Sequence, residues 1–148
     1  MNRSKQLFTL ITSEGELQVS LKEVDVPEPK PHEVIVRMEA SPINPSDMWP
    51  MFGPASLDKA TFDTDKSALV APVHKPLLNR IKSRLDQTLP IGNEGAGTVV
   101  KAGDSPEAQA LMGKTVSILT GAAYTEYACV PMQACVPHLD STTPTPAA

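Results

Sequence analysis

Pro90-Ile91-Gly92-Asn93-Glu94-Gly95-Ala96-Gly97-Thr98-Val99-Val100 is the stretch on which the prediction of the fold depends. A dinucleotide-binding loop needs a strand, then G-x-G-x-x-G, then a helix whose N-terminus faces the phosphates. Here the glycines have a different spacing, follow a proline and lead into β-branched residues typical of a strand. We therefore expect them to permit a tight turn and close backbone packing rather than to hold a phosphate.

Short strands are predicted on both sides of this stretch. Apolar residues alternate with polar ones around a turn at Ser13-Glu14-Gly15, and β-branched residues fill Glu33 to Glu39. Strands are expected at 7–11, 17–21, 33–39, 114–119 and 124–130, and short helices from Ser46 or Asp47 to about Met51 and at 107–112. This pattern predicts a mainly β chain, a barrel or a sandwich.

Residues 53–90 form an extended connection of different character. Leu77, Leu78, Ile81 and Leu85 recur at helical spacing, and Pro76 fits a first helical turn, so a helix is expected near 76–86. Cationic side chains occupy the remaining positions, which favours a solvated face and leaves a local anion contact as the alternative. These cations are Lys75, Arg80, Lys82 and Arg84.

The totals exclude several classes of protein. The 148 residues suffice for one domain, and a net charge of −4 disfavours nucleic acid and anionic membranes as partners. No apolar run is long enough to span a membrane, and no apolar segment follows the basic N-terminus, so we expect a cytoplasmic protein. Two cysteines and three scattered histidines predict buried or half-buried thiols and no metal site.

Four motifs in order resemble the zinc-free medium-chain dehydrogenase/reductases, the quinone oxidoreductases and related enoyl reductases. They are Ser41-Pro42-Ile43-Asn44-Pro45-Ser46-Asp47, the stretch 90–100, Gly113-Lys114-Thr115-Val116 and Gly121-Ala122-Ala123-Tyr124-Thr125-Glu126-Tyr127. The resemblance implies that residues 1–139 form a GroES-like catalytic domain, a partly open β-barrel with a few short helices. It also implies an oxidoreductase that uses NADPH.

Asparagines stand where the zinc-dependent relatives of this family have zinc ligands. Asn44 takes the place of a cysteine and Asn93 that of a histidine. Amides are poor zinc ligands beside thiolate and imidazole, so the resemblance implies chemistry without zinc.

The resemblance also suggests site residues. It implies that Asn44 and Tyr124 contact the nicotinamide end of NADPH or the substrate beside it. We assign Trp49, Asn93 and Glu94 to the substrate cleft. For Glu94 two roles stay open, a carboxylate that ties loops together through backbone N–H groups and a catalytic group. The catalytic residues are unknown, since residues 48–55 lack the tyrosine that enoyl reductases use.

Residues 140–148 are expected to be a linker toward a nucleotide-binding Rossmann domain that this chain lacks. The chain would then be the substrate side of an NADPH-dependent quinone or enone oxidoreductase. It would be inactive alone, bind no cofactor tightly, and need a Rossmann domain in cis or in trans. We also expect a homo-oligomer. The alternative is a β-barrel module without enzyme activity that self-associates or holds a ligand.

Overall fold

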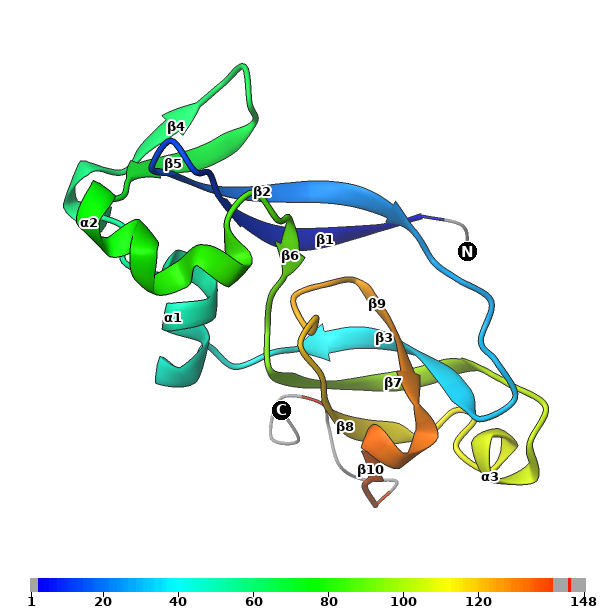
Figure 1. Ribbon diagram of the computed structural model, residues 1–148. Helices are drawn as coiled ribbons and strands as arrows, with labels where there is room; N and C mark the ends of the chain where they lie inside the picture. The colour runs from blue at the N-terminus through cyan, green and yellow to red at the C-terminus, as the bar shows by residue number, and fades with distance from the viewer. Residues whose placement is uncertain (1–2, 140–143, 145–148) are drawn as a thin grey trace. The chain divides into compact units, whose positions relative to one another are not determined.

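The computed structural model describes residues 3–139 and residue 144 (Figure 1). The chain forms two compact units, each with its own antiparallel sheet. The first unit consists of Met1–Gln6, Glu23–Ile43 and Gly92–Ala148, and the second of Leu7–Lys22 and Asn44–Ile91. The prediction of a single domain over 1–139 stays a prediction.

Five strands in the order β4-β5-β2-β1-β6 form one sheet. They are β1 (Arg3–Ile11), β2 (Glu16–Asp25), β4 (Thr61–Asp63), β5 (Ala68–Pro72) and β6 (Leu89–Pro90). The β1–β2 hairpin confirms the strands predicted on either side of Gly15, which turns with a φ of 91°. Most of this sheet belongs to the second unit, while β1 and β2 are each divided between the two units.

The second unit also contains α1 (Pro45–Phe52) and the helices of the long connection 53–90 that follows it. The latter are the 3₁₀ turn at Leu57–Lys59, α2 (Lys75–Leu78) and the 3₁₀ helix Asn79–Arg84. The helix expected near 76–86 is therefore interrupted rather than continuous. The backbone of Ile81 leaves the helical region (φ −125°) where its side chain enters a core with Ile11 and Leu17. The β4–β5 hairpin inside this connection was not expected.

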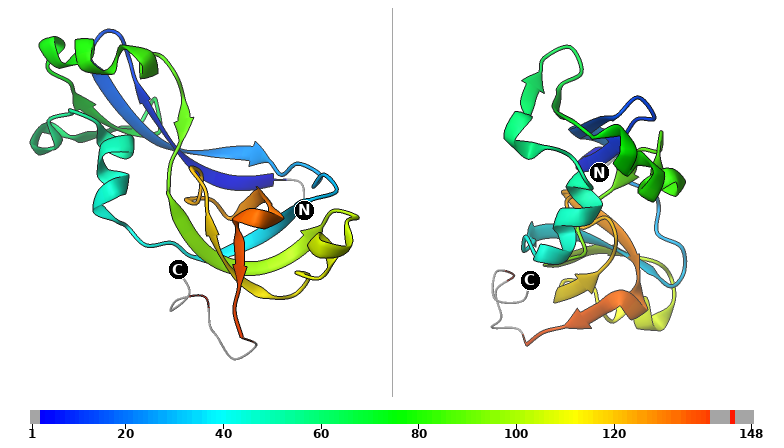
Figure 2. Two further views of the ribbon diagram at one scale, coloured as in Figure 1. Left: turned by 60° about the horizontal axis from the view of Figure 1, so that its bottom comes forward. Right: turned by 60° about the vertical axis from the view of Figure 1, so that its left-hand side comes forward.

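Strands in the order β10-β8-β7-β3-β9 form the other sheet, in the first unit. They are β3 (Glu33–Ala40), β7 (Glu94–Ala102), β8 (Thr115–Leu119), β9 (Tyr127–Pro131) and β10 (Cys135–Pro137). Figure 2 shows helix α3 (Pro106–Gln109) in the connection between β7 and β8. The core contains Val34, Val36, Val99, Val116 and Ile118.

The quoted glycine stretch runs directly into strand β7, with no helix after it. A Cβ atom on Gly97 would lie 2.0 Å from the carbonyl oxygen of Arg37 on β3, so only glycine permits this strand pairing. The expected close backbone packing is therefore confirmed. The mainly β class with open sheets and few short helices is confirmed as well. Residues 140–143 and 145–148 of the predicted linker lie outside the described residues.

Candidate functional site

Asn44 is the N-cap residue of helix α1 and stands where zinc-dependent relatives have a cysteine. Pro45 is the first helical residue, and the backbone N–H of Asn44 donates to Oδ2 of Asp47 at 2.9 Å. The carboxylate of Asp47, which is 2% exposed, thus forms part of a capping box at the start of the helix. The cap predicted at Ser46 or Asp47 was wrong by two or three residues, because a proline fits the first helical position and lets the helix start earlier.

The C-terminal end of α1 is held by Arg84. Its guanidinium donates to the carbonyl oxygens of Trp49 at 3.2 Å and Pro50 at 2.8 Å. The Trp49 carbonyl also accepts from the N–H of Gly53 at 2.8 Å, and cations near the C-terminal end of a helix are favourable. Burial lowers the pKa of Arg84. Arg84, one of the four cations noted in the sequence, therefore binds backbone carbonyls rather than an anion. Trp49 itself is 55% exposed.

Three segments of the first unit meet around Tyr124, and we call them the Tyr124 junction: residues 41–43, residues 92–93 and residues 122–124. The hydroxyl of Tyr124 donates to the carbonyl oxygen of Pro42 at 3.1 Å. The hydroxyl of Ser41 donates to the carbonyl oxygen of Ala123, also at 3.1 Å. The segment after β3 and the segment after β8 are thus joined by two hydrogen bonds, and each segment donates one of them from a side chain to the backbone of the other.

Gly92 supplies the third part of the Tyr124 junction. Its carbonyl oxygen accepts a hydrogen bond from the backbone N–H of Ala123 at 3.0 Å. Gly92 has a φ of 103°, and a Cβ there would lie 2.6 Å from the backbone nitrogen of Tyr124. The tyrosine therefore packs directly on the glycine backbone, and no other residue fits.

An open pocket of about 220 Å³ borders the Tyr124 junction. It is lined by Met38, Glu39, Ala40, Ser41, Ala123, Tyr124 and Thr125. The carboxylate of Glu39 accepts hydrogen bonds from the Thr98 hydroxyl at 2.7 Å and from Arg37 at 3.0 Å. The hydrogen bond from Thr98 has the largest effect, and together with the bond from Arg37 it lowers the pKa of Glu39. Glu39 is therefore an anion at neutral pH. The pocket therefore combines an aromatic ring, a hydroxyl and a fixed negative charge.

The predicted site residues are divided between the two units. Tyr124, Asn93 and Glu94 belong to the first unit, and Asn44 and Trp49 to the second. The backbone carbonyl of Asn93 accepts a hydrogen bond from the N–H of Thr120 at 2.8 Å, which places Asn93 at the Tyr124 junction. Glu94 begins β7, opposite Leu119 of β8.

Sequence reasoning missed Ser41, Glu39 and Arg84 as parts of these sites. Ser41 lies in the first motif, directly before the proline whose carbonyl binds Tyr124, so the motif itself contained the signal. Arg84 offered no signal, because its contact with α1 joins positions 34 and 35 residues apart.

A second pocket of the first unit has a volume of about 190 Å³. Two of the hydroxyl groups that line it are engaged with neighbours. Oγ of Ser4 lies 3.0 Å from Oγ1 of Thr125 and accepts from the N–H of Tyr127 at 3.2 Å.

Within residues 3–139 and 144, no group of three or more His, Cys, Asp or Glu side chains is arranged to hold a metal ion. No helix in the described part of the chain has the length and apolar character needed to cross a membrane.

No model of a protein family matches the sequence, and no curated protein matches it. Solved structures do match. A candidate NADPH:quinone reductase from Mesorhizobium loti is 26% identical, with a TM-score of 0.60 over 97% of this chain. A quinone oxidoreductase from Pseudomonas syringae is 26% identical over 95% (TM-score 0.56), and one from Coxiella burnetii 18% over 99% (TM-score 0.58).

The chain has the GroES-like fold of the quinone reductases. The resemblance drawn from the four motifs is thereby confirmed at the level of the fold and of these structural relatives. This GroES-like chain spans 39%, 35% and 40% of the length of the three proteins. What those longer proteins bind and transform is a matter for a proposal about this chain.

Proposed function

We propose that this chain is the substrate-side domain of an NADPH-dependent, zinc-independent oxidoreductase that acts on quinones or enones. The observation that carries the proposal is the Tyr124 junction, built around an open pocket in a chain with the fold of quinone reductases. Solved relatives named as quinone oxidoreductases support the class of reaction.

NADPH would supply the hydride, and this chain would hold the acceptor. The open pocket beside Tyr124, of about 220 Å³, would admit a single-ring quinone, and a ring stacked on Tyr124 would be fixed in orientation. Because the Ser41 hydroxyl already donates to the Ala123 carbonyl, the donors to a quinone oxygen would be backbone N–H groups around it. Tyr124 also fixes Pro42 and hence the segment that leads to Asn44, the second proposed contact of the nicotinamide end.

We propose that this chain contacts only the nicotinamide end of the cofactor. The glycines at 92, 95 and 97 lie in a turn and a strand that leads to no helix, so they offer no cradle for the pyrophosphate. We therefore propose that a nucleotide-binding domain, in cis or in trans, binds most of NADPH. This chain alone would bind NADPH weakly or not at all and would be inactive.

The amides at two positions support chemistry without zinc. Asn44 and Asn93 present amides where related enzymes have a thiolate and an imidazole, and amides are poor zinc ligands by comparison. We also propose that the protein works in the cytoplasm.

Calorimetry with NADPH and an assay of NADPH oxidation test this proposal on the chain itself. Tetramethyl-1,4-benzoquinone is the suitable acceptor, because its fully substituted ring does not add the thiols of Cys129 and Cys135. We expect no turnover, together with quinone-induced NMR shifts at Tyr124 and Ser41 that disappear in Tyr124→Ala. Micromolar affinity of this chain for NADPH would refute the proposal that a separate domain binds most of the cofactor. Absence of quinone-induced shifts at these residues would refute the substrate site.

A module without enzyme activity that self-associates is the second candidate function. The end position of β4 in its sheet and the exposed side chain of Phe62 on it favour self-association.

A further inference from the structure

Strand β4 ends the sheet of the second unit and exposes a large aromatic side chain. Strand β4 (Thr61–Asp63) pairs with β5 on one side only (Figure 1). Phe62 lies opposite Leu69 in this pairing. Phe62 is 69% exposed. An edge strand presents unpaired backbone groups that can pair with another strand, and an exposed phenylalanine adds apolar surface to that edge.

The other sheet ends are protected, and β4 is not. Among the described residues, the strands that end the two sheets are β4, β6, β9 and β10. Proline occurs in three of them, as Pro90 in β6, Pro131 in β9 and Pro137 in β10. Proline has no N–H and so blocks strand addition. Only β4, in the part of the chain that the structure describes, lacks this device.

The charges around Phe62 complement one another when the segment meets a second copy of itself. Asp58 and Lys59 precede the strand, and Asp65 and Lys66 follow it. In an antiparallel pair centred on Phe62, Lys59 of each copy lies toward Asp65 of the other, and Asp58 toward Lys66. A two-fold axis makes each of these attractions occur twice. A register shifted by one residue toward the C-terminus would instead oppose Asp63 to Asp63.

Lys59 and Asp65 are available for such a contact. Both side chains are exposed, and neither makes an ion pair among the described residues. Both lie just outside the three-residue strand, Lys59 in the 3₁₀ turn before it and Asp65 in the turn after it. They would therefore contact the second copy at the two ends of a short ladder.

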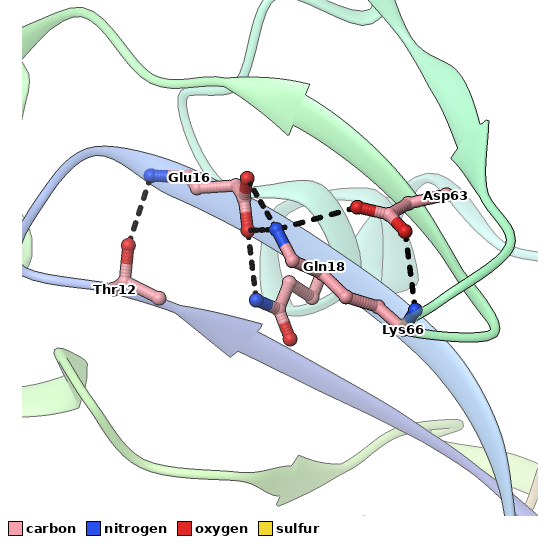
Figure 3. Close-up of polar contacts among 5 residues, drawn as sticks. All are labelled: Thr12, Glu16, Gln18, Asp63 and Lys66. Carbon is pink, nitrogen blue, oxygen red and sulfur yellow. Dashed lines mark hydrogen bonds and ion pairs between the residues drawn. The ribbon is translucent and has the colours of Figure 1, made fainter.

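The hairpin that carries this edge is fixed to the sheet behind it. Nζ of Lys66 lies 2.7 Å from Oε1 of Glu16 on β2 and 3.5 Å from Oδ2 of Asp63 (Figure 3). The N–H of Glu16 donates to the Thr12 hydroxyl at 3.1 Å, and Gln18 donates to the Glu16 carboxylate at 2.8 Å. An edge held in place before association loses less conformational entropy when it pairs.

We propose that β4 is a self-association edge, on which a second copy of this chain pairs its own β4 antiparallel about a two-fold axis through Phe62. Phe62 of each copy packs on Phe62 of the other, Thr61 lies opposite Asp63, and Lys59 contacts Asp65 at both ends. The β4-containing sheets of the two copies then form one continuous sheet. This inference concerns a surface of the second unit and does not rest on the proposed reductase function.

Sedimentation equilibrium of the full chain, from micromolar to millimolar concentration and at low salt, measures the association. We expect a monomer–dimer equilibrium. Phe62→Thr introduces a β-branched residue, which suits a strand, but removes the aromatic contact, and it should raise the dissociation constant at least about tenfold. Val136→Asp, on the proline-containing edge β10, is the matched control and should leave the constant unchanged.

A charge-swap cycle tests the register. Lys59→Asp places like charges at both ends, as does Asp65→Lys, and each should raise the dissociation constant roughly tenfold because symmetry doubles the effect of each surface pair. The double variant restores opposite charges and should recover the affinity of the natural chain. Lys114→Asp and Asp104→Lys, two exposed positions of the first unit, make the same changes of net charge and should have little effect.

The outcomes separate the alternatives. A monomer at every concentration overturns the proposal, as does a dimer that resists Phe62→Thr or responds to Val136→Asp. A dimer that both single swaps weaken and the double swap fails to restore overturns the register centred on Phe62. Circular dichroism of each variant shows that it is folded, so weaker association is then assigned to the edge.

Discussion

The hydroxyl of Tyr124 donates a hydrogen bond to the backbone carbonyl of Pro42, 3.1 Å away, across 82 positions of sequence. The contact joins the turn before β9 to the segment after β3, and Ser41 returns a bond to Ala123. Two of the four family-like motifs thus hold each other in place, which explains why both occur in one chain even before any ligand is considered.

Removal of the Tyr124 hydroxyl should destabilise the first unit. Tyr124→Phe keeps the ring but leaves the Pro42 carbonyl without this donor, and we expect a loss of about 1 kcal/mol in the free energy of unfolding by urea. Tyr127→Phe is the matched control, because no hydrogen bond of its hydroxyl is seen among the described residues. Equal stability of the two variants would show that the Pro42 bond contributes nothing.

A side chain at Gly92 should be poorly tolerated. Gly92→Ala would place its Cβ 2.6 Å from the backbone nitrogen of Tyr124, at a φ of 103° that alanine rarely adopts. Strain of both kinds predicts a loss of about 2 kcal/mol or more in unfolding free energy. Gly121→Ala is the comparison, since its Cβ meets nothing within 4 Å, and it should change stability by less than about 0.5 kcal/mol.

If Arg84 holds the end of α1, its loss should cost more than the loss of a neighbouring cation. Arg84→Ala removes two charged donors from the carbonyls of Trp49 and Pro50, and about 2 kcal/mol of stability should be lost. Arg80→Ala, at an exposed position of the same 3₁₀ helix, should be close to neutral. Tryptophan fluorescence during unfolding reports on α1 directly, because Trp49 is the only tryptophan of the chain.

The strands with dense β-branched residues could be predicted from the sequence, and the short hairpin could not. Val34, Ile35 and Val36 are buried in β3 as their residue types indicate. Thr61-Phe62-Asp63 is only three residues long and is flanked by charges, so nothing local marks it as a strand. Its conformation depends on pairing with β5, which in turn pairs with β2, and such non-local partners leave no periodic signal.

The same limit applies to the candidate site. The motifs predict Tyr124 and Asn44 as contacts of the cofactor or substrate, and that stays a prediction. In the structure Tyr124 holds a turn and Asn44 precedes the first residue of a helix. The strand predicted from Tyr124 begins only at Tyr127, because the N–H of Thr125 bonds to the carbonyl of Ala123 and turns the chain there. Tyr124 is oriented by the backbone carbonyl of Pro42 and by the backbone of Gly92. Such backbone contacts do not depend on side-chain type, so the sequence does not show them.

The two thiols should react slowly in the folded protein. Burial raises the pKa of Cys129 to about 11, with the nearby Glu33 carboxylate adding to it, and burial alone raises that of Cys135 to about 11. The ordinary value of 9.0 is two units lower, and the thiolate is the reactive form. The more basic thiolate is also a better nucleophile, which offsets about half of that difference on a logarithmic scale.

Alkylation by iodoacetamide at pH 8 should therefore be about tenfold slower in the folded chain than in urea. Cys129→Ser and Cys135→Ser assign the remaining rate to one thiol each. The sign of the linkage follows: because the folded state holds its thiol protons more tightly, stability should fall as the pH rises from about 9 toward 11. Equal rates in the folded and unfolded chains would contradict the burial of both thiols. Protection of Cys135 alone would show that the carboxylate of Glu33 does not suppress ionisation of Cys129.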